Sequence, residues 1–414
     1  MRRKILSGCG FFGNVVFGAL LSVISIPLVI RTGGVDTWGS VAVGQSVGGL
    51  TAVIVMLGWS VSGPREVALS PHPGLLYRSS LVQRGIVVLP AFALGGTAIA
   101  FIHTHDVIAA SLSYAAYAIP GMSATWFYIG LLDGRRLFLL DTAPRLVLSC
   151  LGIAAMATFQ SVLAWLVMSV VGSAASCFFG WRGTVVNGKS DRVAINWRSE
   201  IRSIWSQCQD LGISGTAAVY SSGPVALVGA VAPGALAVFA LGDRMLRYAL
   251  LGMLPVSQLT QGWVPRAGRS EVPSRAWRAL AFSLVIAILC VIVSGFALPA
   301  LSGLLGSGFI SVSVSQGWAI GVTVAAVVLS RCTGLAFLVA LGRNRTVLIS
   351  TLVGAVCGLL LVPVLAISFG STGAAWAVAA SELTVLAIQL GSLIRRQRSM
   401  QLKQNDSSLG KVLK

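Results

Sequence analysis

The sequence predicts an all-α polytopic membrane protein with twelve transmembrane helices in two six-helix lobes. Of its 414 residues, 56% are hydrophobic and only 10% are charged, whereas soluble domains carry about 25% charged residues. The mean hydropathy is +0.86. Apolar runs that reach the roughly 20 residues needed to span a bilayer recur along the whole chain. This composition excludes a soluble globular enzyme, a disordered chain and a fibrous repeat protein.

Each predicted span is an apolar run found with a window of about 19 residues. The first run follows Met1–Lys4 and is too long for the apolar region of a signal peptide, and no small-residue cleavage site follows it. We therefore interpret it as the first transmembrane helix. The twelve runs cover residues 10–30, 39–60, 84–102, 107–130, 142–160, 161–181, 210–231, 235–256, 279–300, 316–341, 346–369 and 372–394.

The distribution of basic residues predicts that both termini are cytoplasmic. With twelve spans, 26 Lys and Arg residues fall in the inner segments or at their helix ends, including Arg84 and Arg145, and three fall within spans. The outer segments hold one, Arg31. Cytoplasmic loops of membrane proteins are enriched in Lys and Arg, so this asymmetry supports a multi-pass membrane protein with both termini on the cytoplasmic side.

The longest inner loop divides the chain into the two predicted lobes. Residues 1–206 form the N-terminal lobe with the connecting loop 182–209, residues 207–394 the C-terminal lobe, and residues 395–414 a basic cytoplasmic tail. The loop is basic and holds Trp197 and Trp205, a pattern typical of an interfacial amphipathic segment. Equal halves are common among transporters. The outer loops are too short for the catalytic loop that a glycosyltransferase or polymerase would need.

Two sequence features suggest nucleotide or nucleic-acid binding, and both are better explained otherwise. The net charge of +18 comes from residues between apolar runs rather than along one face. Residues 183–190 match the phosphate-binding pattern G-x-x-x-x-G-K-S, but a membrane helix precedes them where that chemistry needs a strand. We expect neither ATP hydrolysis nor nucleic-acid binding.

No metal centre, cofactor or catalytic nucleophile is predicted. The run from His103 to Asp106 lies in an outer hairpin without further ligands, and the seven cysteines are scattered through apolar runs. Small-residue pairs at i, i+4 in the spans indicate close helix packing: Gly44 with Gly48, Gly317 with Gly321, and Gly354 with Gly358.

Charged residues inside predicted spans are the main functional candidates, because such groups are costly in lipid and face a cavity or each other. Asp243, Arg244 and Arg247 cluster in the eighth span, Arg331 lies in the tenth and Glu382 in the twelfth. One interpretation is a structural ion pair, such as Arg331 with Glu382. The other is a polar cavity whose arginines bind phosphate through paired hydrogen bonds, with Asn14 and Gln45 as further lining.

Several segments resemble the bacterial polysaccharide flippases, which belong to a superfamily shared with multidrug antiporters and the lipid II flippase. The segments span the chain in the order of that family, with Ile129 and Leu132 as departures from its W-x-[FY]-Q-G signature and the Glu after it. They are Ile26–Arg31 with Gly34 and Trp38-Gly39, Ser62–Ala68, Trp126–Gly130, Leu236–Arg247 with Pro255 and Pro265-Arg266, and Gly370–Ala375 with Ser381-Glu382.

The resemblance implies two six-helix lobes around a central cavity that opens alternately to each side. It also implies a flippase of the bacterial cytoplasmic membrane that moves undecaprenyl-diphosphate-linked oligosaccharide repeat units across that membrane by alternating access. We expect Arg31, Arg244, Arg247 and Arg331, with Asn14 and Gln45, to bind the substrate. Asp243 and Glu382 are expected to couple transport to Na+ or H+, or to hold the arginines. Partners would be membrane lipids and polysaccharide assembly proteins, and the protein is expected to be a monomer. The alternative is a cation-coupled multidrug exporter of the same fold.

Overall fold

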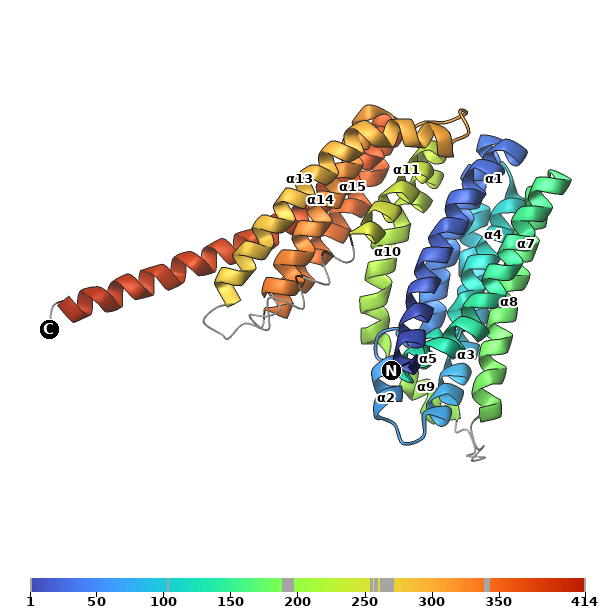
Figure 1. The fold of residues 1–414 in the computed structure, drawn as a ribbon, viewed down its shortest axis with the longest axis horizontal. Coiled ribbons are helices and arrows are strands. Elements are labelled where there is room, and N and C mark those ends of the chain that lie inside the picture. Colours follow the sequence, from blue (N-terminus) through green and yellow to red (C-terminus); the bar gives the residue numbers. More distant parts are fainter. Residues whose placement is uncertain are drawn as a thin grey trace. The chain divides into compact units, whose positions relative to one another are not determined.

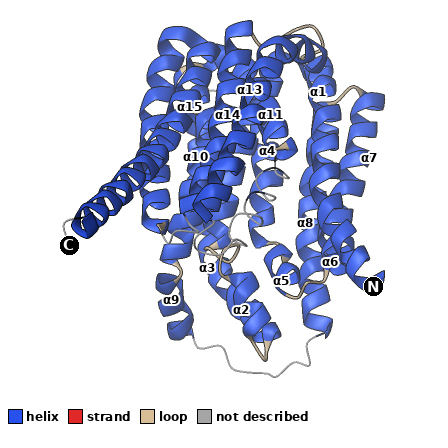
Figure 2. Cartoon of the chain, turned by 60° about the vertical axis from the view of Figure 1, so that its left-hand side comes forward, coloured by secondary structure: helices blue, strands red, loops and turns tan. Residues whose placement is uncertain are grey.

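The computed structural model describes residues 2–102, 104–187, 197–253, 256, 260, 272–338 and 343–412. Helices account for nearly all of this part of the chain, and the described residues contain no β-strand (Figure 2). Lipid offers no hydrogen bonds to the backbone, so an apolar chain that crosses a bilayer must satisfy its N–H and C=O groups within helices or closed barrels. The predicted all-helical class is confirmed.

Contacts divide the chain into two compact units. Unit 1 comprises residues 1–240 and 303–310, and unit 2 comprises residues 241–302 and 311–414. The sequence placed the lobe boundary near residue 206, and that boundary stays a prediction. In chain order the helices are α1 (Arg2–Met56), α2 (Gly63–Leu69), α3 (Pro73–Phe101), α4 (Val107–Ala118), η1 (Ile119–Met122), α5 (Thr125–Gly130), α6 (Gly134–Arg136), η2 (Leu137–Thr142), α7 (Ala143–Phe159), α8 (Val162–Asn187), α9 (Trp197–Ser206), α10 (Cys208–Val231), α11 (Pro233–Gly252), α13 (Val272–Leu305), α14 (Val314–Arg331), η3 (Cys332–Leu338) and α15 (Asn344–Val412).

The longest two helices each contain two of the predicted spans. Gly34 interrupts α1 with φ 85°, and Gly370 interrupts α15 with φ 61°. Both values lie in the left-handed region, which glycine adopts without the steric cost of a Cβ. In the described residues, eight helices are long and apolar enough to cross a membrane. With α1 and α15 each divided at its glycine, and with α10 and α11 counted, the helices correspond to all twelve predicted apolar runs.

Several helices begin earlier than the apolar runs suggested. α3 begins at Pro73 rather than near residue 84, and the α6–η2–α7 segment begins at Gly134 rather than near residue 142. Proline at the first turn favours the start of α3, since its missing N–H has no helical partner there. Arg84 and Arg145, counted with the inner loops from sequence, therefore lie inside helices.

Two motifs that the sequence analysis set aside have local structural roles. Gly183–Asn187, the first part of the phosphate-loop pattern, is the last part of helix α8, and residues 188–190 lie outside the described part of the chain. Asp106 caps α4, because its Oδ1 accepts a hydrogen bond from the Ala109 amide at 2.9 Å. His103 lies outside the described residues.

Close packing of α1 against α4 organises unit 1 (Figure 1). Gly44 and Gly48 face α4, where a methyl group on Gly44 would collide with the Ala110 carbonyl oxygen. A methyl group on Gly48 would lie 2.5 Å from the Tyr114 carbonyl oxygen. In unit 2, Gly321 packs in the same way against the Val291 backbone of α13. The predicted role of these small-residue pairs in helix contact is confirmed for these three glycines.

We predict that Gly48→Ala destabilises the protein by about 1–3 kcal/mol, because the new methyl group meets a backbone atom that cannot move without separating α1 from α4. Gly49→Ala is the matched control. Its methyl group would lie 3.7 Å from Ser222 Oγ, an ordinary van der Waals contact. Thermal unfolding of both purified variants in detergent measures the difference. Equal losses of stability would contradict the proposed packing.

Candidate functional site

A partly open cavity of about 320 Å³ lies among α1, α4, α7 and α8 of unit 1. Its volume is at the lower end of the range of ligand pockets, about 300–1,000 Å³. The lining combines one cation, Arg145, with hydroxyl groups and a few large apolar side chains. The lining residues are Leu21, Ser25, Ala116, Tyr117, Pro120, Thr142, Arg145, Leu146, Ser149, Trp165, Ser169 and Ser173.

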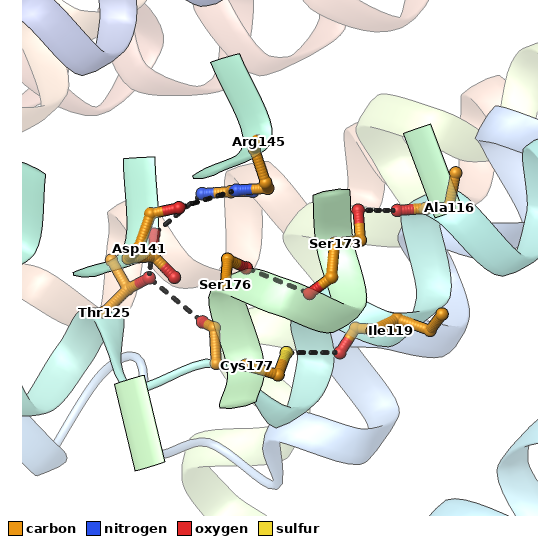
Figure 3. A network of polar contacts seen from close by, with 9 residues as sticks. Ala116, Ile119, Thr125, Asp141, Arg145, Ser173, Ser176 and Cys177 are labelled. Carbon is orange, nitrogen blue, oxygen red and sulfur yellow. Dashed lines mark hydrogen bonds and ion pairs between the residues drawn. The ribbon is translucent and has the colours of Figure 1, made fainter. Parts of the chain in front are cut away.

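Arg145 is held at the cavity by a buried carboxylate one helical turn earlier (Figure 3). Its Nη2 donates to Asp141 Oδ2 at 2.7 Å, and Thr125 Oγ1 donates to the same oxygen at 3.1 Å. The Asp141 side chain is fully buried, whereas that of Arg145 is 32% exposed. The pair therefore turns its carboxylate into the protein and presents its guanidinium to the cavity.

Polar atoms without partners lie beside this pair. Asp141 Oδ1 and Thr142 Oγ1 are buried and have no hydrogen-bond partner in the described structure. Both residues end the π-helix η2, and single π-turns inside helices occur frequently at functional sites. A buried polar atom without a partner costs about 1–3 kcal/mol. Thr142 lines the cavity, so a polar ligand there would relieve part of this cost.

Hydrogen bonds tie α8 to the segment formed by α4 and η1 (Figure 3). Ser173 Oγ of α8 donates to the Ala116 carbonyl of α4 at 2.8 Å, and the Cys177 thiol approaches the Ile119 carbonyl at 3.4 Å. Ser169 Oγ is used within α8, where it donates to the Trp165 carbonyl at 2.8 Å. All of these bonds satisfy donors that lipid could not satisfy. The bond from Ser173 to Ala116 also fixes the register of α8 against α4.

Another cation of unit 1, Arg84 of α3, has no exposed surface. Its Nη1 donates to the carbonyls of Ser123 at 2.8 Å and Gly121 at 3.3 Å. The guanidinium lies 5.8 Å from the Tyr77 ring centre and 5.9 Å from that of Trp126, within cation–π range. No salt bridge joins Arg84 to a carboxylate in the described part of the chain. Carbonyls and aromatic faces thus compensate this charge.

The aromatic signature Trp126–Gly130 packs directly against the Ser62–Ala68 segment. A methyl group on Gly63 would collide with the Trp126 ring, and one on Gly130 would lie 2.7 Å from Val67 Cβ. Trp126 is also stacked on Trp59, with ring centres 4.8 Å apart. The short helices α2 and α5 lie together at one end of unit 1 (Figure 1). Two motifs separated by about sixty residues therefore form one structural cluster with Arg84.

Asp243 and Arg247 form the ion pair that their i, i+4 spacing suggests. Arg247 Nε lies 2.7 Å from Asp243 Oδ2, and its Nη2 lies 3.1 Å from Oδ1. This paired geometry uses both carboxylate oxygens. Asp243 therefore holds an arginine, one of the two roles expected of it.

The other candidate residues of unit 2 lie on three different helices. Arg244 follows Asp243 on α11 and Arg331 ends α14; both are partly exposed. Glu382 is 9% exposed in α15. The described contacts include no Arg331–Glu382 salt bridge.

The candidates of unit 1 also differ in their surroundings. Arg31 is exposed, and its Nε donates to Ser307 Oγ at 3.2 Å. Gln45 is 7% exposed, and its Oε1 is buried without a hydrogen-bond partner among the described residues. The side chain of Asn14 lies outside the described residues. The roles of all these residues in substrate binding stay predictions.

Asp141, Arg145 and Arg84 were not predicted as site residues, because Asp141 was assigned to the inner loop 131–141 and the two arginines to helix ends. A signal for the first two was present: Asp141 and Arg145 have the same i, i+4 spacing as Asp243 and Arg247. Extending the fifth span toward the N-terminus by one or two turns would have brought the pair inside it.

Comparisons with solved structures show which fold the chain has. No family model matches the chain, and no curated protein matches it in sequence. The lipid II flippase MurJ has a TM-score of 0.71 at 12% identity, over 94% of this chain and 87% of that one. A multidrug resistance MATE family transporter of the MOP superfamily, in an inward-facing conformation, has a TM-score of 0.56 at 16% identity, over 93% and 99%. The MATE transporter VcmN of Vibrio cholerae has a TM-score of 0.53 at 13% identity, over 97% of both chains.

These similarities establish the fold. The chain is a multi-pass helical membrane protein with the fold of these transporters, as the sequence predicted. The narrower resemblance to the polysaccharide flippases stays a prediction, and so does the orientation of the termini.

We predict that Arg145→Gln costs about 3 kcal/mol of stability, because removing one partner of a buried ion pair leaves the other charge uncompensated. This value is at the low end for such pairs, since Arg145 is 32% exposed. The double variant Asp141→Asn/Arg145→Gln removes both charges and should recover much of the loss. A double-mutant cycle on thermal unfolding measures the coupling. Additive effects would show that the two residues do not interact.

Proposed function

We propose that the protein is a flippase for lipid-linked, diphosphate-bearing oligosaccharides. The observation that carries the proposal is the cavity of unit 1, where a guanidinium and several hydroxyl groups face the interior and the nearby carboxylate is turned away. Arginine binds phosphate oxygens through paired hydrogen bonds, and hydroxyl groups hydrogen-bond to sugars. The shared fold with a lipid II flippase supports the same class of substrate.

Transport in this proposal needs no covalent chemistry. The diphosphate and sugars enter the polar cavity, and the lipid tail stays in the bilayer because its transfer into a polar site would be unfavourable. Arg145 contacts the anionic group, while Thr142 and the serines of the cavity contact hydroxyls. The arginines predicted from sequence would bind the substrate at other stages of alternating access.

A cation-coupled multidrug exporter is the second candidate, since MATE transporters share the fold. The buried carboxylate of Glu382 in α15 favours it, because a carboxylate at membrane depth can bind a cation or proton. The two candidates differ in the charge that the substrate-binding cavity must accommodate. Unit 1 presents a cation, which favours anionic substrates.

We predict that deleting the gene in its native host causes lipid-linked oligosaccharides to accumulate and surface polysaccharide to be lost. Complementation with Asp141→Asn/Arg145→Gln should fail to restore surface polymer, because the cavity then lacks its cation but keeps no unpaired charge. The matched control is Arg136→Gln, which removes an exposed arginine that pairs with Asp133 at 3.3 Å. Mass spectrometry of extracted lipids and surface staining measure both products at matched protein levels.

Unchanged glycans in the deletion strain, with increased sensitivity to cationic drugs, would overturn the flippase proposal and favour the exporter. Full complementation by the double variant would exclude the unit 1 cavity as the binding site. It would not contradict the proposal that the protein is a flippase.

We also propose that Glu382 couples transport to a Na+ or H+ gradient. Glu382→Gln should make uptake or flipping in proteoliposomes independent of the imposed ion gradient, because the neutral amide cannot exchange a proton and binds Na+ more weakly. Asp243→Asn is the comparison, since it removes a second carboxylate from a predicted span, one that is paired with Arg247. An unchanged gradient dependence in Glu382→Gln would exclude this role.

A further inference from the structure

A second cavity, of about 570 Å³, lies in unit 2 at one end of the hairpin formed by the two halves of α15. It is lined by two arginines, two hydroxyl residues and three small or apolar residues: Arg343, Thr346, Ala387, Ile388, Gly391, Ser392 and Arg395. We propose that this cavity binds the phosphate headgroup of an anionic membrane phospholipid. The site is separate from the cavity of unit 1 and does not depend on the proposed transport activity.

The depth of the cavity in the bilayer follows from the sequence around it. The apolar span of α15 runs from Arg345 to Arg395, with a mean hydropathy of 2.6 in its apolar window. The two halves of α15 meet at Gly370, so the first and last residues of the span lie at the same end of the hairpin. The arginines therefore mark the boundary between the hydrocarbon core and water, which is where lipid phosphates lie.

The charge of the cavity is suited to an anion. Arg343 and Arg395 are both exposed, and neither has a salt bridge to a carboxylate in the described structure. Arg343 is positioned by Ser392, whose Oγ accepts from its Nη1 at 2.9 Å. The one acidic residue between them in sequence is Glu382, thirteen residues before Arg395, or roughly 20 Å along a helix. The guanidinium groups are thus available to phosphate oxygens, with Thr346 as an additional donor.

The apolar side of the cavity is suited to the lipid tail. Ala387 and Ile388 lie about two helical turns deeper in the span than Arg395. Gly391 lies between these apolar residues and the arginines, and a methyl group there would meet no atom within 4 Å. A soluble phosphate would use only the cationic end, whereas a phospholipid would use the whole length of the cavity. This gradient from charged to apolar lining favours the phospholipid.

Native mass spectrometry of the full-length protein in detergent, titrated with phosphatidylglycerol or phosphatidylcholine, tests the proposal. We expect the wild type to retain phosphatidylglycerol over phosphatidylcholine. Arg343→Gln and Arg395→Gln should each weaken retention of phosphatidylglycerol about fivefold, the effect of about 1 kcal/mol for each basic residue near an anionic lipid surface. Arg136→Gln, an exposed arginine of unit 1, should leave retention unchanged.

A second variant fills the cavity without altering its charge. Gly391→Phe places a side chain in the open space and should weaken phosphatidylglycerol binding as much as losing both arginines. Gly85→Phe is the matched control, because a side chain on Gly85 of α3 also meets open space. Thermal unfolding of both variants checks that they fold.

Three results would overturn the proposal. The first is that Gly391→Phe and both arginine variants retain phosphatidylglycerol at the wild-type level. This would show that the lipid binds elsewhere. Equal retention of phosphatidylglycerol and phosphatidylcholine by the wild type would exclude an anion-selective site. Displacement of the lipid by millimolar inorganic phosphate, with equal thermal stabilisation, would show that the ligand is a soluble phosphate.

Discussion

The constraint on which the structure depends is that a bilayer supplies no hydrogen bonds and little electrostatic screening. Backbone groups therefore pair within helices, and cations inside the protein require compensation from the protein itself. Arg84 is an example, because backbone carbonyls and two aromatic rings stabilise it, and no salt bridge reaches it within the described part of the chain. Its donors tie α3 to the segment after α4, so the charge also fixes the positions of neighbouring helices.

The same constraint separates four of the described arginines into three physical classes. Arg84 is fully buried and has a structural role. Arg145 is partly exposed to a cavity and is oriented by the buried Asp141. Arg343 and Arg395 are exposed at the end of an apolar span, where their charge costs least. A substrate or lipid can reach only the second and third classes, so the exposure of each guanidinium separates structural from binding roles.

Packing between helices follows from residues that lack side chains. Gly44 and Gly48 bring α1 against α4, and Ser173 then bonds across from α8 to α4. The cavity of unit 1 is bordered by these helices, so its shape depends on contacts made by glycines that never touch it. The signature Trp126–Gly130 has a comparable role, because it packs on α2 and on Arg84 rather than lining the cavity.

The sequence alone determined the helical class and the twelve apolar segments, because hydropathy depends on composition over about twenty residues and needs no tertiary contacts. It also predicted the Asp243–Arg247 pair, since i, i+4 spacing brings two side chains together on any helix. Only the tertiary structure showed that Arg145 faces a cavity and that Arg84 does not. Both are arginines near the start of an apolar run, and burial depends on which neighbouring helix each one meets. Sequence periodicity does not encode that choice, because the neighbours come from segments distant in the chain.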